Sequence, residues 1–331
     1  MPRPSGPPDA ADTMVAAEVA FFTKALAGFA KSKAKFEVRS MIHDLVILDS
    51  SFNPPTLAHM RMATAALQFL RSNPLPTYRS TRLLLLLSVN NADKAPKPAA
   101  FEERLALMLA MARDTHAVLA SSASEGPDAF DIDIPIDIGL TSEPYFHSKS
   151  NAIAASPFYV RPDLSPSAVP GSKITPDQLF LIGYDTLIRI FDPKYYKAPA
   201  DNDDHGDGAG ASAAASLPEG LAATSTPMQV ALTPLMRRAR LRVTTRPDSD
   251  WGDEETQRRW VAEHVDALGG PTEHWASRIS LDTGGAGTGA SAVSSTVARE
   301  ASRAHDTARL EKLVGPAVLS WLENRSPYGE S

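Results

Sequence analysis

Two side chains near the start of the chain could bind a phosphate. Thr56 and His59 lie three residues apart, at the beginning of an amphipathic stretch that follows an apolar run ending at Asp49. Pro54 and Pro55 stand between the two parts, and they must end a strand because proline lacks the N–H that a strand ladder requires. A hydroxyl and an imidazole at a helix N-terminus, just beyond a strand, lie where an open α/β sheet binds phosphate. The segment therefore predicts a nucleotide site.

The same two residues also have a plainer interpretation. An isolated T-x-x-H is more often an N-capping threonine followed by a surface histidine. The surrounding sequence favours the phosphate site, because residues 45–48 read as a strand buried on both faces and residues 59–71 have apolar positions at helical spacing. Thr56 and His59 then fall near the first turn, where unpaired N–H groups and the helix dipole attract anions.

A second candidate phosphate site lies near the other end of the chain, in the sequence VSSTVAR that begins at Val293. Ser294, Ser295 and Thr296 can cap the helix expected to follow, and Arg299 offers a planar fork of donors to phosphate oxygens. A serine-rich helix start is by itself usually only a cap. Both interpretations stay open at this point.

A third candidate follows the strand expected at residues 178–182, where Gly183 and Asp185 stand two residues apart. Glycine lets the backbone approach a ligand closely, and a carboxylate at the carboxyl end of a strand can accept hydrogen bonds from ribose hydroxyls. A helix N-cap is an equally good interpretation of Asp185.

Together these segments resemble one known family. SFNPPTLAH closely resembles the nucleotide-binding signature of the nucleotidylyltransferase superfamily, (H/T)-x-G-H, with the lead-in typical of nicotinamide mononucleotide adenylyltransferases, and Ala58 replaces the usual glycine. VSSTVAR resembles the superfamily motif I-S-S-T-x-x-R. The segment SVNNADK, which ends at Lys94, is similar to S-P-V-N-D-x-Y-x-K, and residues 101–108 and 183–187 also match. Residues 141–146 and 188–196 look most like the divergent fungal branch.

The resemblance implies roles for individual residues. It implies catalytic roles for Thr56, His59 and Arg299, ATP phosphate binding by Lys94, Ser294, Ser295 and Thr296, and nucleotide or substrate binding by Ser51, Phe52, Asn53, Gly183 and Asp185.

The resemblance also implies a fold and a reaction. The fold is α/β, a doubly wound, Rossmann-like parallel sheet of the nucleotidylyltransferase type. The reaction is adenylyl transfer from ATP to nicotinamide mononucleotide, giving NAD and pyrophosphate, with nicotinic acid mononucleotide as a further acceptor. Mg²⁺ is expected to enter with ATP, whose oxygens and water hold it, so no protein metal site is expected. Two alternatives remain: a regulatory nucleotide-binding protein of the same fold with weakened catalysis, and an adenylyltransferase for another acceptor such as phosphopantetheine.

Composition agrees with a globular enzyme and argues against some partners. Of 331 residues, 43% are hydrophobic and 22% charged, which suffices for a substantial core. A net charge of -6 gives no reason to expect nucleic acid, and no apolar stretch reaches the length of a membrane span. The chain has no cysteine, which is compatible with the expected cytoplasmic or nuclear location. The sequence leaves open whether the chain forms a homo-oligomer.

Breaks in composition divide the chain. Residues 1–12 are Pro-rich and predicted to be disordered, residues 13–37 form a helical appendage, and residues 38–325 form the nucleotidylyltransferase domain. Within that domain, residues 198–229 read as a mobile insertion. Further strands are expected at 83–87, 240–245 and 277–281, and further helices at 254–268 and 296–304.

Overall fold

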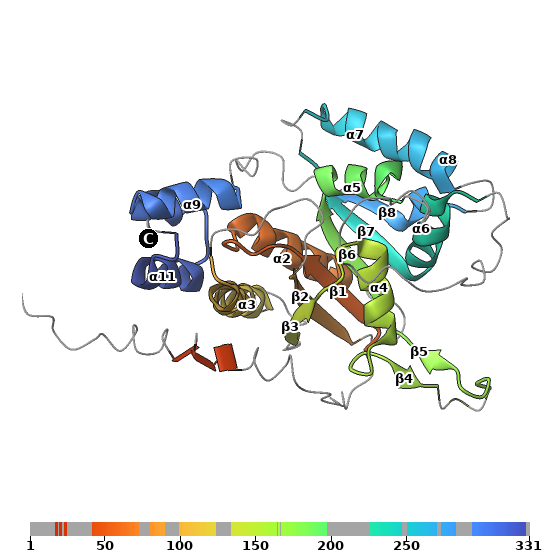
Figure 1. Ribbon diagram of the computed structural model, residues 1–331, viewed down its shortest axis with the longest axis horizontal. Coiled ribbons are helices and arrows are strands. Elements are labelled where there is room, and N and C mark those ends of the chain that lie inside the picture. The colour runs from red at the N-terminus through yellow and green to blue at the C-terminus, as the bar shows by residue number, and fades with distance from the viewer. Residues whose placement is uncertain are drawn as a thin grey trace, which may run out of the picture.

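The core of the computed structural model is a six-stranded sheet in which every pairing is parallel (Figure 1). The model describes residues 17–18, 20–21, 23–24, 42–72, 80–89, 99–123, 134–163, 165, 167–196, 225–246, 250–269, 273–282 and 293–328. The strands are β1 (Asp44–Asp49), β2 (Thr81–Ser88), β3 (Ile136–Thr141), β6 (Asp177–Gly183), β7 (Ala239–Thr244) and β8 (Ile279–Asp282). Their order in the sheet is β3-β2-β1-β6-β7-β8, which makes the fold doubly wound, as predicted.

Burial on both faces explains the composition of the central strands. In β1, Val46 and Leu48 point into one hydrophobic cluster while Leu45 and Ile47 point into another, and each is 1% exposed or less. Successive side chains of a strand point to opposite faces, so a strand covered on both sides must be apolar throughout. The continuous leucine run of β2 divides between the two clusters in the same way.

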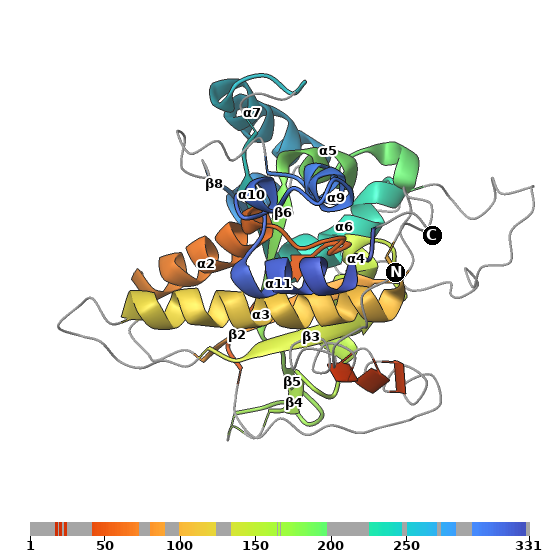
Figure 2. The same cartoon turned by 90° about the vertical axis from the view of Figure 1, so that its left-hand side faces the viewer.

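Two layers of helices cover the sheet. In Figures 1 and 2, α2, α3, α9, α10 and α11 lie on one side of the sheet, and α4 to α8 lie on the other. Within the described residues, the helices are α2 (Leu57–Ser72), α3 (Phe101–Ala123), α4 (Phe146–Ala155), α5 (Tyr184–Ile190), α6 (Pro227–Arg238), α7 (Glu254–Trp260), α8 (Asp266–Gly269), α9 (Ser295–Arg303), α10 (Thr307–Leu310) and α11 (Pro316–Arg325). A π-helical segment, Val261–Val265, joins α7 to α8, and short 3-10 turns span Pro193–Tyr195 and Trp275–Arg278.

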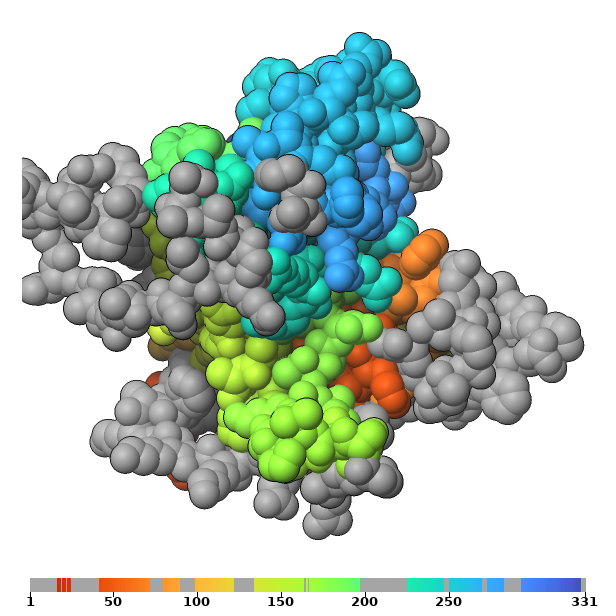
Figure 3. Space-filling model, turned by 90° about the vertical axis from the view of Figure 1, so that its right-hand side faces the viewer, coloured from red at the N-terminus to blue at the C-terminus, as the bar shows by residue number. Residues whose placement is uncertain are grey.

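A small antiparallel hairpin lies apart from the main sheet. Its strands are β4 (Arg161–Pro162) and β5 (Lys173–Ile174). Figure 3 shows this segment below the surface formed by α6 to α8. Across the described part of the chain, no helix is long and apolar enough to cross a membrane.

The predicted strands and helices are confirmed to within two residues, but the strands β3, β4 and β5 and the helices α4, α6, α10 and α11 were not predicted. In the expected appendage at 13–37, the described residues are helical, and Glu18 pairs with Arg113 of α3 at 2.6 Å. Residues 225–229, assigned to an insertion, form the cap and first turn of α6, while 1–12 and 198–224 lie outside the described residues. Tyr328, three residues beyond the predicted domain end at 325, is only 3% exposed.

Candidate active site

The candidate site lies at the carboxyl edge of the sheet, between β1 and β6. The strand order reverses at this pair, because β1 continues to β2 on one side and β6 continues to β7 on the other. In open α/β sheets ligands bind outside the carboxyl ends of the strands at such a switch point. Asp49 and Gly183 end these two strands, so the sequence that follows each strand begins at this edge.

His59 is held in one orientation by hydrogen bonds to both ring nitrogens. Its Nδ1 lies 3.1 Å from the backbone nitrogen of Thr56 and 2.8 Å from the Thr56 hydroxyl, and its Nε2 lies 2.9 Å from Oγ of Ser50. A backbone N–H can only donate, so Nδ1 is an acceptor and Nε2 carries the proton of the neutral ring. Thr56 is only 3% exposed, and its hydroxyl bonds to the ring. The alternative of a capping threonine beside a free surface histidine therefore does not describe this pair.

The surroundings of His59 keep it uncharged. Burial lowers the pKa of His59 to about 4, and the positive charge of Arg246 lowers it further in the same direction. Arg246 follows β7, and the buried Gln257 accepts a bond from its N–H at 3.2 Å and donates to its carbonyl at 2.8 Å. The ring is therefore neutral at pH 7, with its nitrogens bonded to Thr56 and Ser50, and Arg246 supplies positive charge.

The second motif meets the first across more than 240 residues of sequence. Arg299 of α9 donates from Nη1 to the carbonyl of Asn53 at 2.6 Å, and Ser295 donates to the carbonyl of Pro54 at 2.8 Å. The other terminal nitrogen of Arg299 donates to the hydroxyl of Thr296 at 3.0 Å. Ser294 is the N-cap of α9, because its hydroxyl accepts from the N–H of Val297 at 3.3 Å.

Two residues without a predicted role also hold the turn at residues 51–55. Arg104 of α3 donates to the carbonyl of Ser51 at 2.9 Å, and Tyr328 donates to the side-chain oxygen of Asn53 at 2.9 Å. Phe52 is fully buried and Asn53 is 5% exposed. Their side chains therefore face the protein interior, and contact between this turn and a dinucleotide stays a prediction. Ala58 likewise packs against the hydrophobic cluster on this face.

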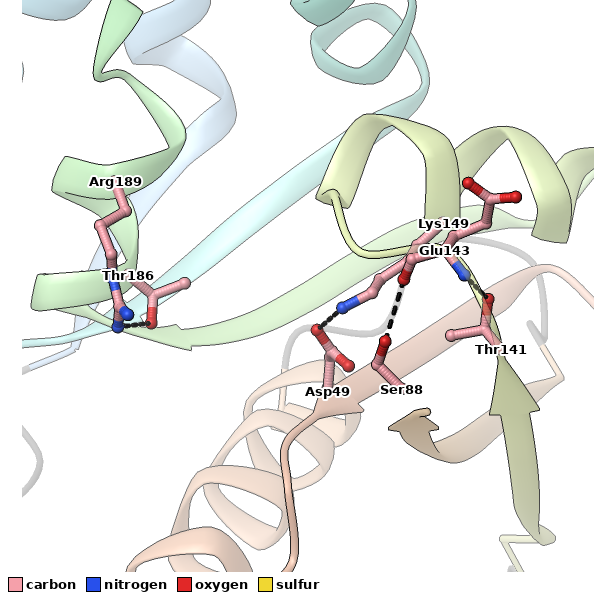
Figure 4. A network of polar contacts seen from close by, with 7 residues as sticks. All are labelled: Asp49, Ser88, Thr141, Glu143, Lys149, Thr186 and Arg189. Carbon is pink, nitrogen blue, oxygen red and sulfur yellow. Dashed lines mark hydrogen bonds and ion pairs between the residues drawn. The ribbon is translucent and has the colours of Figure 1, made fainter. Parts of the chain in front are cut away.

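Gly183 and Asp185 form a compact corner where β6 leads into α5. Gly183 is the N-cap of α5, so Asp185 lies within the helix and is not its N-cap. The Asp185 carboxylate pairs with Arg189 at 2.8 Å, and both side chains are about two-fifths exposed, at 41% and 38%. A Cβ at position 183 would lie 2.8 Å from the Asp185 carboxylate, the end of a flexible side chain that would have to move aside. Figure 4 shows Arg189 bonded to Thr186 beside the sheet edge.

A buried ion pair, which the sequence analysis did not predict, joins β1 to α4. Lys149 Nζ lies 2.5 Å from the Asp49 carboxylate, and their side chains are 5% and 8% exposed (Figure 4). Burial raises the pKa of Asp49, although the nearby Lys149 ammonium opposes this. Ser88 also donates to the carbonyl of Glu143 at 3.0 Å, so the segment between β3 and α4 is bonded to the end of β2.

The first turn of α4 adds aromatic side chains to this part of the molecule. Tyr145 and His147 stack with ring centroids 5.5 Å apart, and Tyr196 lies 5.6 Å from His147. Phe146 packs edge-on against Phe180, 5.6 Å away. Burial lowers the pKa of His147 to about 4, so this ring is uncharged at neutral pH.

The other predicted features concern Lys94 and metal binding. Lys94 lies outside the described residues. Within the described chain no group of three or more histidine, aspartate or glutamate side chains is arranged to hold a metal ion. The residues that the sequence analysis missed are Ser50, Arg104, Lys149 and Arg246. Arg104 falls in a segment that resembles the family, but no local pattern distinguishes the other three.

Comparison with known proteins supports the sequence resemblance. No protein family model matches the chain. A Schizosaccharomyces pombe protein named "Putative nicotinamide mononucleotide adenylyltransferase" is 32% identical over 157 residues, which are 47% of this chain and 45% of that protein. Over that stretch the resemblance to the nicotinamide mononucleotide adenylyltransferase family is confirmed, and this relative is fungal.

Two structures of Plasmodium falciparum nicotinic acid mononucleotide adenylyltransferase, one complexed with NaAD and one with APC, align with 86% of this chain and 97% of theirs at 12% identity. The TM-score is 0.42 in both cases, which is too low to support an argument about the fold, so the fold class rests on the strand order described above.

The uncharged state of His59 makes a direct prediction for NMR. In a titration of ¹⁵N-histidine-labelled protein, we expect the His59 ring to remain neutral, with its proton on Nε2, from pH 8 to about pH 5, because its pKa is lowered from 6.5 to about 4. A His59→Asn variant identifies the resonance. Since the unfolded chain binds this proton more readily, His59 also makes the folding free energy less favourable as the pH falls from 6.5 towards 4. A ring that titrates near pH 6.5 would contradict this environment.

The buried ion pair between Lys149 and Asp49 predicts how single and double variants differ in their free energy of unfolding. Lys149→Met leaves the Asp49 carboxylate buried without a counter-charge and should lower the free energy of unfolding by about 3 kcal/mol at pH 7. The double variant Asp49→Asn/Lys149→Met should recover most of this loss, because no buried charge remains. Urea denaturation measures both, with Lys173→Met on the exposed β5 as the matched control. A double variant as unstable as the single one would show that packing, not charge, sets the cost.

Proposed function

We propose that this chain transfers the adenylyl group of ATP to nicotinamide mononucleotide, forming NAD and releasing pyrophosphate, and that it also accepts nicotinic acid mononucleotide. The observation that carries the proposal is the meeting of the two phosphate-binding motifs. Ser295 and Arg299 contact the carbonyls of Pro54 and Asn53 directly, at the switch point of the sheet. Two motifs that are separate in sequence but adjacent in space support one nucleotide site rather than two unrelated helix caps.

The proposed reaction needs no protein base. A phosphate oxygen of the mononucleotide attacks the α-phosphorus of ATP, a new P–O bond forms as the bond to the β-phosphate oxygen breaks, and pyrophosphate leaves with the electron pair. The attacking oxygen is already anionic, so no proton must be removed. Catalysis then depends on positioning and on donors aimed at the developing charge. A neutral His59 fits this requirement, since a base is not needed.

We assign the departing phosphates to the α9 side of the site. Arg299 has five N–H donors in a planar fork, and Ser295 and Thr296 present hydroxyls at the start of the same helix. The N-terminus of α2 and Arg246 add positive potential near His59. Lys94 remains a proposed phosphate contact.

We assign the acceptor to the side of the site formed by α4 and α5. The stacked rings of Tyr145 and His147 are flat and uncharged, which suits a pyridine ring. Asp185 lies in the first turn of α5, two residues after β6 ends, where its carboxylate oxygens can accept hydrogen bonds from ribose.

Mg²⁺ would accompany ATP in this proposal. The charged groups around the turn are mainly donors, and Asp49 is paired with Lys149, so the described residues are not suited to enclose the ion. Bound to ATP, Mg²⁺ neutralises phosphate charge and retains part of its water shell.

Product analysis tests the proposal. Purified full-length chain is mixed with ATP, Mg²⁺ and, separately, nicotinamide mononucleotide, nicotinic acid mononucleotide or phosphopantetheine, and dinucleotide and pyrophosphate are quantified. We expect equimolar NAD and pyrophosphate with the first acceptor, and a loss of about 100-fold or more in turnover in His59→Ala. The matched control is His116→Ala, at an exposed position of α3.

The outcomes separate the alternatives. Product from phosphopantetheine alone would replace the proposed acceptor, and ATP binding without product from any acceptor would support a regulatory protein. Turnover at the wild-type rate in His59→Ala would contradict the role of His59.

A further inference from the structure

Ser50 stands between the end of β1 and the candidate phosphate site, and the resemblance assigns it no role. Its N–H donates to the carbonyl of Leu86 at 3.2 Å, so its main chain continues the pairing of β1 with β2 for one residue beyond the strand. Its hydroxyl lies 2.9 Å from Nε2 of His59. The backbone and the side chain of Ser50 are thus both fixed relative to the sheet edge.

The direction of the bond between Ser50 and His59 follows from the other side of the ring. Because the Thr56 N–H occupies Nδ1, the proton of the neutral ring is on Nε2, and Nε2–H must donate to the Ser50 oxygen. A hydroxyl that accepts in this way keeps its own hydrogen for another acceptor. Among the described residues, His59 is the hydrogen-bond partner of the Ser50 hydroxyl, so this hydrogen can be donated to a ligand.

The same direction excludes a nucleophilic serine. A serine–histidine nucleophile requires the ring nitrogen to accept the hydroxyl proton. Nε2 already carries a proton here, and the Thr56 N–H on Nδ1 prevents the ring from changing tautomer without losing that bond. The Ser50 hydroxyl, held by His59, can therefore donate its hydrogen to a ligand at the sheet edge.

We propose that Ser50 is the residue that donates the hydrogen bond to the bound phosphate, and that His59 acts through Ser50 by orienting its hydroxyl and strengthening it as a donor. A hydrogen bond received by a hydroxyl polarises it and makes its own donation stronger. The phosphate belongs to ATP or to the mononucleotide, an identification that rests on the proposed function. Arg299 and the N-terminus of α2 supply positive potential at the same turn.

Binding and turnover of three variants test the proposal. Isothermal titration with ATP and, in a separate arm, with nicotinamide mononucleotide compares the wild type with Ser50→Ala and Ser50→Thr. Ser280→Ala, at an exposed position of β8, is the matched control. We expect Ser50→Ala to weaken binding of one ligand, or to lower kcat/KM, by about tenfold or more, because a hydrogen bond to a charged group is lost. Ser50→Thr, which keeps the hydroxyl, should stay within about threefold of the wild type.

The titrations with ATP and with nicotinamide mononucleotide answer different questions. The ligand whose affinity falls identifies the phosphate that Ser50 contacts. The proposal would be overturned if Ser50→Ala bound both ligands and turned over as well as the wild type, or better. That result is expected if the Ser50 hydroxyl only accepts the hydrogen bond from His59 Nε2. Unchanged thermal unfolding of Ser50→Ala, together with a shifted ¹⁵N resonance of His59 Nε2, excludes a loss of fold as the cause. If the wild type makes no dinucleotide, the proposed function fails, while the two affinities still decide the role of Ser50.

Discussion

The candidate site depends on how the protein satisfies the backbone of one turn, residues 51–55. A connection between a strand and a helix has carbonyl groups that neither element can pair. Here Arg104 binds the carbonyl of Ser51, Arg299 that of Asn53, and Ser295 that of Pro54. The backbone of Phe52 has φ of 45°, a conformation costing about 1–3 kcal/mol in a non-glycine residue. The contacts from α3 and α9 and the burial of the Phe52 ring offset that cost.

The shape of this turn also determines the protonation state of His59 and the charges that surround it. Because Thr56 ends the turn, its N–H and hydroxyl reach Nδ1 of His59 and leave the proton on Nε2. The site therefore combines a neutral histidine with positive charge from Arg246 and Arg299. The carboxylate nearest the end of β1, Asp49, is neutralised by Lys149. Donors and positive charge without a free carboxylate at the strand end suit a polyphosphate ligand.

The sequence predicted the elements that depend on neighbouring residues better than the contacts between residues far apart in the chain. The strand ending at Asp49 and the helix after Thr56 follow from local apolar patterning, and both are confirmed. The strand β3 was missed although Ile134, Ile136, Ile138 and Leu140 alternate with other residues, a period that indicates a strand.

The interactions that complete the site could not be predicted from local pattern. Lys149 and Asp49 are 100 residues apart, and Tyr328 is 275 residues from Asn53. Phe52 and Asn53 belong to the motif in sequence, yet their side chains are buried. Their place in a segment that resembles a family motif indicated a ligand contact, whereas packing against the core and the bond to Tyr328 determine where the two side chains point.

Contacts from α9 hold the turn at residues 51–55 in place, and hydrogen–deuterium exchange of the Arg299→Ala variant measures their effect. Arg303→Ala, at an exposed position of the same helix, is the control. We expect faster exchange in peptides covering residues 50–60 in Arg299→Ala, with unchanged exchange in β2, because the turn loses its Asn53 contact while the sheet keeps its pairing. Exchange in residues 50–60 that equals the wild type would contradict the claim.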